Sequence, residues 1–273
     1  MAVSIVEALK NVIKDKNFMP NYTALVVMSF CCGLVYFASL SNNTKLLVPT
    51  TILAVAAMIY SEGYHLRYFK SLTTNTTPSM PEWKDAGSIL LTGIKYATAV
   101  LILSLALGAI LLIFGFITAA ATIVSKIFGI ILLMLFFLIC FIMEIFLVVC
   151  LPSFFCTFTD SEGSVLSFLN IKNLCKYFSV NYFITLFTIL ILALLNSCLS
   201  FAASINIKYN LTYIIPLMLA PIIRLWTDNL IAQSYLANKS GEQGSIAKMC
   251  ILLLVLLLIV ILPVILILIF IPR

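Results

Sequence analysis

The chain has 273 residues, of which 63% are hydrophobic and only 10% are charged. This composition excludes a water-soluble globular protein, in which about 25% of residues are charged. The net charge of +6 comes from scattered lysines and arginines that form no compact patch interleaved with aromatic residues, so we expect no nucleic-acid partner. We expect an all-α, polytopic helical membrane protein, because helices satisfy their own backbone in lipid and the apolar runs lack the alternation of barrel strands.

Seven apolar runs are long enough to cross a bilayer core of about 30 Å. In chain order they cover residues 22–40, 46–60, 89–116, 127–151, 182–207, 211–236 and 249–271. The second run is short, so we expect its helix to continue through Glu62, Gly63 and Tyr64 into the membrane interface. We treat residues 1–273 as a single integral membrane domain.

The loops between these runs differ in basic charge. Eleven lysines and arginines lie on the side of the amino terminus and four on the other side. The positive-inside rule predicts a multi-pass protein of the cell membrane with a cytoplasmic amino terminus and an outside carboxyl terminus. Residues 1–19 contain charges and no continuous apolar region, so we expect no cleavable signal peptide.

An internal repeat relates the two halves of the chain. Matched positions pair Ser4, Lys16, Asn21 and Tyr22 with Ser164, Lys176, Asn181 and Tyr182. We predict two parallel three-helix repeats, residues 1–116 and 161–273, joined by a linking span within residues 117–160. Each repeat begins with an amphipathic segment at the cytoplasmic interface, residues 3–16 and 165–176, which lies either among lipid headgroups or against loops of the same protein.

Charged residues at membrane depth are candidates for function, because they are costly to bury in lipid. Glu144 lies in the fourth run, and Arg224 and Asp228 lie four residues apart in the sixth. One interpretation is a buried ion cluster formed by all three residues. The other is that Glu144 and Asp228 are hydrated near the cytoplasmic interface while Arg224 snorkels toward it. Pro216 and Pro221 are each expected to remove a hydrogen bond from the sixth helix and bend it.

The cytoplasmic loop before the third run has residues with structural roles. We expect Trp83 to anchor the membrane interface and Asp85 to cap the following helix with its side chain. His65 has no catalytic or metal-binding pattern around it and is expected to be an interfacial residue. The cysteines lie mostly in apolar runs and form no zinc-ligand pattern, so we expect no metal, no cofactor and no disulfide.

Three segments in order resemble a known family. They are Glu62-Gly63-Tyr64-His65-Leu66-Arg67, Pro81-Glu82-Trp83-Lys84-Asp85 and Gly93-Ile94-Lys95, with later landmarks at Leu151-Pro152, Asp160, Asn181-Tyr182 and Ala232-Gln233-Ser234-Tyr235. The chain resembles the prokaryotic integral membrane family called domain of unknown function four-zero-one-three. The family-like residues are Glu62, Gly63, Tyr64, Arg67, Pro81, Trp83, Asp85, Gly93, Gln233 and Tyr235. Ala232 departs from the glycine expected before Gln233, and the resemblance implies no activity, substrate or catalytic residue.

Three functions stay open at the level of sequence. The first is a non-enzymatic membrane organiser that binds lipids, protein partners or further copies of itself, since the chain has no catalytic motif. The second is a small transporter or channel with a polar site near Glu144, Arg224 and Asp228. The third is a lipid-modifying enzyme, for which His65 with Glu62 and Asp85 is the only set of groups, and a poor one.

Overall fold

The computed structural model describes residues 3–40, 44–75, 79–161, 163–164, 171–205, 213–240, 244–245, 247–251 and 254–255. Every regular element in these residues is a helix, which confirms the all-α prediction. The helices are α1 (Ile5–Ile13), α2 (Phe18–Leu40), α3 (Thr44–Thr74), α4 (Ala86–Val124), α5 (Lys126–Asp160), α6 (Ile171–Cys175), α7 (Val180–Ile205) and α8 (Ile214–Ser240).

Six of these helices, α2, α3, α4, α5, α7 and α8, are long and apolar enough to cross a membrane. They correspond to the first six predicted spans, and α3 continues through Glu62 and beyond as expected. The seventh predicted span, residues 249–271, lies almost entirely outside the described residues. Helices α4 and α5 are longer than predicted, with 39 and 35 residues, because only Ser125 interrupts the helix between them.

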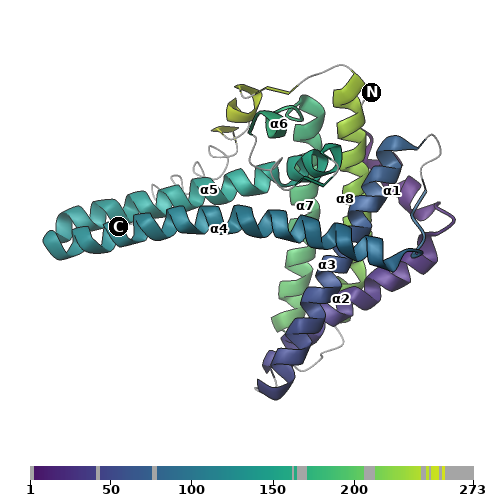
Figure 1. Cartoon of the computed structure of the whole chain (residues 1–273), viewed down its shortest axis with the longest axis horizontal. Coiled ribbons are helices and arrows are strands. Elements are labelled where there is room, and N and C mark those ends of the chain that lie inside the picture. The colour runs from purple at the N-terminus through teal and green to yellow at the C-terminus, as the bar shows by residue number, and fades with distance from the viewer. Residues whose placement is uncertain are drawn as a thin grey trace, which may run out of the picture.

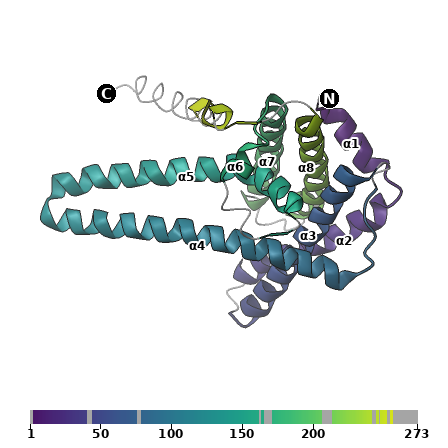
Figure 2. The same cartoon turned by 45° about the horizontal axis from the view of Figure 1, so that its top comes forward.

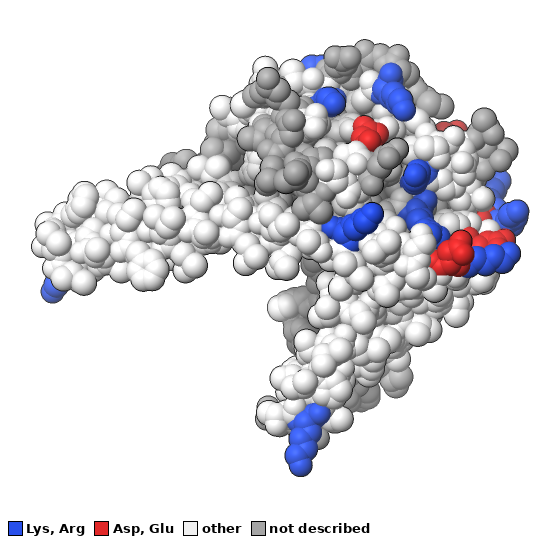
Figure 3. All heavy atoms as spheres, in the orientation of Figure 1, with Lys and Arg blue, Asp and Glu red and all other residues white. Residues whose placement is uncertain are grey.

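The membrane helices form two apolar arms that diverge from a charged body (Figure 1). One arm is the hairpin of α4 and α5, which extends away from the other helices in both ribbon views (Figure 2). The other contains α2, α3, α7 and α8, in which α8 contacts α2, α3 and α7. Figure 3 shows that the surfaces of both arms are almost free of charge, apart from a basic residue at each tip. Basic and acidic side chains gather on the visible face of the body, where the arms meet.

The two arms are joined at a close crossing of α3 and α4. A Cβ atom added to Gly63 would lie 2.1 Å from the carbonyl oxygen of Ile89, and one added to Gly93 would lie 1.9 Å from that of Ile59. Both glycines are therefore required for this backbone-to-backbone approach, as in other membrane helix pairs with small residues at the contact. The crossing fixes the position of every group on α3 relative to α4.

Helix α1 packs against α8 of the same chain, so it lies on a helix of the protein and not on a loop as in the second predicted placement. Ala8 and Val12 are fully buried, and the indole N–H of Trp226 donates to the carbonyl of Ile5 at 2.9 Å. Other apolar side chains of this helix remain exposed, including Val6 at 69%. The helix therefore contacts the protein with one face and leaves apolar side chains on another.

The internal repeat stays a prediction. The described order of a short helix followed by two long helices occurs twice, as α1, α2 and α3 and again as α6, α7 and α8. Residues 165–170, in the second amphipathic segment, and most of the seventh span lie outside the described part of the chain. The boundaries at residues 116 and 160 are therefore untested as repeat boundaries.

The prediction of two helix-interrupting prolines in α8 is wrong for Pro216. The helix begins at Ile214, so Pro216 lies in its first turn, where a backbone N–H has no acceptor within the helix. Pro221 does lie inside the helix and removes one internal hydrogen bond. Helix α8 nevertheless continues to Ser240 and carries the polar groups described next.

Candidate functional site

A buried polar cluster joins α3 to α8. Arg224 Nη2 lies 3.0 Å from Glu62 Oε2, and Arg224 Nε lies 3.5 Å from Asp228 Oδ1. The second oxygen of Asp228 lies 2.5 Å from His65 Nδ1. Glu62 and His65 are three residues apart on α3, and Arg224 and Asp228 are four apart on α8, so each pair lies on one helix face.

The cluster contains one more carboxylate than cation when His65 is neutral. Asp228 is fully buried and His65 is only 2% exposed, whereas the side chains of Arg224 and Glu62 are 29% and 35% exposed. Isolated charges are unfavourable in such surroundings and must be paired. Arg224 lies close to both carboxylates and offsets part of their charge.

The predicted trio of intramembrane charges is only partly correct. The structure brings Arg224 and Asp228 together, but Glu144 is exposed on α5 and forms no ion pair or hydrogen bond with the described residues. Glu144 lies on the hairpin arm, whereas α8 packs mainly against α2, α3 and α7. Glu62 occupies the place that the first interpretation gave to Glu144, and Asp228 is fully buried, whereas the second interpretation expected it to be hydrated.

His65, expected from the sequence to be an interfacial residue, is buried within the protein and pairs with an acidic residue. Its partner, Asp228, lies 163 residues further along the chain, so no local pattern indicates the pair. The available signal was the spacing: Glu62 and His65 lie one turn apart on α3, as Arg224 and Asp228 do on α8. Two such short charged stripes on apolar helices favour each other as packing partners.

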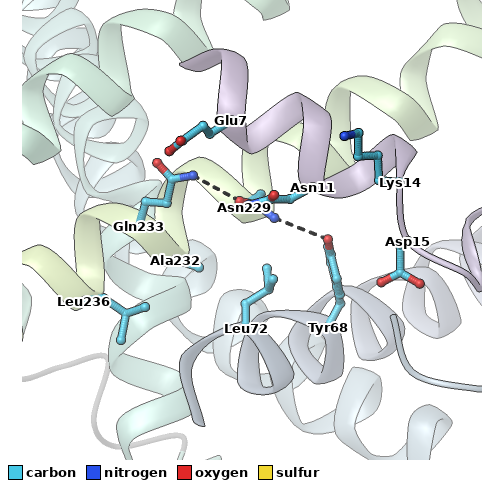
Figure 4. A pocket seen from close by; sticks show the side chains of 10 residues that line it. All are labelled: Glu7, Asn11, Lys14, Asp15, Tyr68, Leu72, Asn229, Ala232, Gln233 and Leu236. Carbon is cyan, nitrogen blue, oxygen red and sulfur yellow. Dashed lines mark hydrogen bonds between the residues drawn. The ribbon is translucent and has the colours of Figure 1, made fainter. Parts of the chain in front are cut away.

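A second set of polar contacts follows the cluster along α8, toward α1 (Figure 4). Asn229 donates to the hydroxyl of Tyr68 at 3.4 Å, and Gln233 donates to Asn229 at 3.3 Å. The backbone N–H of Ser4, just before α1, donates to Gln233 at 2.9 Å. The side chains of Tyr68, Asn229 and Gln233 border a cavity of about 440 Å³ between α1, α3 and α8, whose wall also contains charged side chains of α1 and of the residues just after it.

A larger hollow, of about 710 Å³, lies on the other side of the cluster, where the two arms diverge. Its wall is formed by α3, α4 and α5 and is mostly apolar, with Val55, Val100 and Phe154 among its residues. Glu62 and Arg224 are the charged residues of its described wall. The buried His65–Asp228 contact therefore lies between this hollow and the cavity under α1.

The family-like residues on α3 and α4 have structural roles at the crossing. Gly63 and Gly93 form the close contact, and a guanidinium nitrogen of Arg67 donates to the hydroxyl of Ser88 on α4. The ring of Tyr64 stacks on that of Trp83 with the centroids 4.2 Å apart. Trp83 thus packs on α3, a contact that its predicted role as an interface anchor did not include.

Asp85 precedes α4, as predicted, but caps it differently. Its side chain makes no capping hydrogen bond, and its backbone has a φ of 63°. The carbonyl of Asp85 instead accepts from the N–H groups of Ser88 and Ile89. Pro81 lies in the same connection, followed by an exposed pair in which a hydrogen bond to Lys84 lowers the pKa of Glu82 and raises that of Lys84.

Tyr235 belongs to a second polar contact, at the body end of α8. The hydroxyls of Tyr235 and Tyr177 both donate to the carboxylate of Asp160, the last residue of α5. Burial and the hydrogen bond to Asp160 raise the pKa of Tyr177. The contact ties the ends of α5 and α8 together and borders a small pocket of about 320 Å³.

The described part of the chain contains no group of three or more His, Cys, Asp or Glu residues placed to hold a metal ion. The fold and the polar cluster together define a multi-pass α-helical membrane protein. A family model described as DUF4013, protein of unknown function, matches residues 46–207, and the chain belongs to this family. The match includes Glu62 and His65, while α8 with Arg224 and Asp228 lies beyond the matched range. No curated protein and no solved structure matches the chain.

Proposed function

We propose that this protein is a non-enzymatic organiser of the cell membrane that holds a lipid in the hollow between its two arms. The observation that carries the proposal is the hollow itself: about 710 Å³ of mostly apolar space, bordered by three membrane helices. Acyl chains fill such a space favourably because dispersion contacts are lost wherever it stays empty. Membrane lipids are the expected partners, and the exposed apolar flanks of α4 and α5 offer surface for protein partners or further copies of the chain.

The orientation proposed from the sequence fits the positions of the charges. Lys45 begins the α3 arm and Lys126 begins α5 at the tip of the hairpin, whereas residues such as Lys10, Arg67 and Lys95 lie toward the body. We propose that the body and the amino terminus face the cytoplasm, in agreement with the positive-inside rule. Both lysines at the tips then lie at the outer interface.

The depth of the ion cluster favours lipid binding over transport. From Lys45 to Glu62, α3 rises about 26 Å, so the cluster lies near the inner boundary of a hydrocarbon core of about 30 Å. Substrate sites of secondary transporters lie near the middle of the bilayer instead. This depth fits a structural role, in which the ion cluster holds α3 against α8 at the inner boundary of the core, next to a hollow filled by lipid.

A small transporter is the second candidate, and one observation favours it. Two sets of polar contacts lie next to each other along α8: one joins Glu62, Arg224, Asp228 and His65 at the hollow, and the other joins Tyr68, Asn229 and Gln233 at the cavity under α1. In this alternative, water reaches Asn229 from both cavities. An enzyme that modifies lipids is the least supported function, because the described wall of the hollow contains no His or Cys side chain.

Lipid retention tests the first proposal. Ala97 lies in the wall of the hollow, and Ala106 is exposed on the same helix two and a half turns further on, on the opposite face. We expect Ala97→Phe to reduce the lipid that the purified protein retains in native mass spectra, and Ala106→Phe to leave it unchanged. Equal retention by the wild type and both variants would refute lipid binding in the hollow.

Water accessibility tests the transport alternative. A single cysteine at position 229, in a cysteine-free background, is exposed to a membrane-impermeant thiol reagent from either side. Lipid binding predicts labelling from neither side or from the cytoplasmic side only, because Asn229 is 2% exposed. Labelling from outside would favour transport over the first proposal.

A further inference from the structure

A basic pocket lies directly beyond the hollow, at the body end of the same three helices. It has a volume of about 460 Å³, and its wall includes Arg67 and Lys70 of α3 and Lys95 of α4. The described residues of this wall include no carboxylate. Three cations around one concave surface, without a neutralising acid among them, are suited to an anionic ligand.

Hydroxyl groups complete the polar wall. Ser88 and Thr92 lie one turn apart on α4, followed by Lys95 after a further turn, so all three share one face of the helix. Arg67 already donates to the Ser88 hydroxyl, which holds its guanidinium at the edge of the pocket. Hydroxyls and charged nitrogens on facing helices are the donors that a phosphate group uses.

The far wall of the pocket is formed by the chain just after α5. Gly163 has a φ of +85°, and a Cβ atom added there would lie 3.7 Å from Cδ of Lys95 and 3.4 Å from Cζ of Phe158. This backbone conformation favours glycine. At this distance the turn lies beside the aliphatic part of the Lys95 side chain.

The pocket and the hollow are consecutive along the same helices. On α3 the hollow reaches Glu62 and the pocket begins at Leu66; on α5 the hollow ends at Phe154 and the pocket includes Phe158. On both helices the two spaces are separated by about one helical turn, so they lie next to each other between the arms. Arg67 and Lys70 lie about 7 to 12 Å further along α3 than Glu62, which is the headgroup region if Glu62 lies at the inner boundary of the core.

We propose that this pocket binds the phosphate headgroup of an anionic phospholipid from the cytoplasmic leaflet, with its acyl chains in the hollow. The inference rests on the proposed function and adds the class of lipid. Charge complementarity supplies the selectivity, as in other basic pockets between membrane helices on the cytoplasmic side. A free phosphate ion matches the same donors, but it leaves the adjoining apolar hollow unfilled. The basic pocket and the hollow together therefore fit a lipid.

The test compares lipid selectivity in two charge-matched variants of the full-length protein. Lys70→Gln/Lys95→Gln removes two cations from the pocket, and Lys10→Gln/Lys16→Gln removes two exposed cations outside the walls of both spaces. Each protein is reconstituted in nanodiscs with equal phosphatidylglycerol and phosphatidylcholine, and its retained lipids are measured by native mass spectrometry. Thermal unfolding profiles check that both variants are folded.

We expect the wild type and Lys10→Gln/Lys16→Gln to retain phosphatidylglycerol preferentially. The pocket variant should lose about fivefold of this preference for each lysine, and about 25-fold for both, while still retaining phosphatidylcholine. An unchanged preference in the pocket variant, or no preference in the wild type, would overturn the headgroup site and leave lipid binding in the hollow intact. Retention of no lipid at all would instead refute the proposed function.

Inorganic phosphate distinguishes the two sources of the ligand chemistry. We add it at about 10 mM to wild-type protein in phosphatidylcholine nanodiscs and measure thermal stability. No stabilisation, together with stabilisation by phosphatidylglycerol, supports the lipid headgroup. Stabilisation by phosphate that matches the effect of phosphatidylglycerol and vanishes in Lys70→Gln/Lys95→Gln would assign the pocket to a soluble anion and overturn the proposal.

Discussion

Substitution of Gly93 by alanine perturbs the contact that joins the two arms. The new Cβ atom would lie 1.9 Å from the carbonyl oxygen and 2.9 Å from the carbonyl carbon of Ile59, both of which belong to the backbone. No side-chain rotation relieves such a contact. Helices α3 and α4 must therefore move apart by more than about 1 Å before an ordinary carbon–oxygen contact is restored.

The size of the effect follows from this displacement. A radial gap of about 1 Å forfeits up to half of the dispersion energy of the contacts that it opens. Overpacking of a close contact typically destabilises by about 1 to 3 kcal/mol, and a backbone-to-backbone clash belongs at the upper end, so we expect about 3 kcal/mol. Gly63→Ala should cost a similar amount, since its Cβ atom would lie 2.1 Å from the carbonyl of Ile89. The double variant should fall well short of the sum, because the first substitution already separates the helices.

Gly108 provides the matched control on the same helix, because a Cβ atom added there would meet nothing within 4 Å. Unfolding by sodium dodecyl sulfate, followed by tryptophan fluorescence, compares the variants. Trp83 is a suitable reporter, since it stacks on α3 beside the crossing. We expect Gly108→Ala to stay within about 0.5 kcal/mol of the wild type. Equal stability of Gly93→Ala and Gly108→Ala would refute the close crossing.

Other substitutions test the cluster, the tyrosine contact and the placement of α1. Asp228→Asn should destabilise by about 3 kcal/mol because it alters a fully buried carboxylate that contacts both His65 and Arg224, whereas Glu62→Gln, at a side chain 35% exposed, should cost about 1 kcal/mol; equal effects in detergent unfolding would contradict the difference in burial. Because burial and a hydrogen bond raise the pKa of Tyr177, its stabilising effect is present below the ordinary tyrosine pKa of about 10 and is lost as the pH rises further. Stability measured between about pH 8 and 11 should therefore decline more steeply in the wild type than in Tyr177→Phe, and parallel profiles would contradict this. Trp226→Phe removes the hydrogen bond that holds the start of α1, so limited proteolysis should release this helix severalfold faster than in the wild type; an unchanged rate would show that packing alone holds it.

The membrane helices were predictable because their signal is local. Long apolar runs specify helices in lipid whatever their partners are, and α3 continues past Glu62 as the sequence indicated. The ends of α4 and α5 were not predicted, because no proline or glycine cluster stops either helix and Ser125 alone makes the turn. Helix length in an apolar hairpin is thus set by the turn, which hydropathy does not mark.

The site depended on contacts between helices, which are not encoded in local patterns. Arg224 and Asp228 were found because they lie on one face of one helix, but Glu144 was grouped with them by depth alone. The roles of Gly63 and Gly93 were missed for the same reason: the close pair is formed across two helices, and a search for small residues within one helix does not detect it. Both glycines were visible in the sequence as part of the family pattern. The reason that glycine is needed there is the close crossing of α3 and α4, which only the structure shows.

The two arms differ in length, and this difference supports the proposal that a lipid lies between them. From Lys45 to Glu62, α3 rises about 26 Å, whereas the hairpin extends about 45 Å from Lys95 to Lys126. If both tips reach the outer interface of one bilayer, the longer arm must tilt more than the shorter one. The arms then diverge from the body, as they do in Figure 1, and the space between them widens away from the crossing. In the proposed function, acyl chains fill this space because both of its walls are apolar, and we propose that the basic pocket at its narrow end selects the headgroup of the bound lipid.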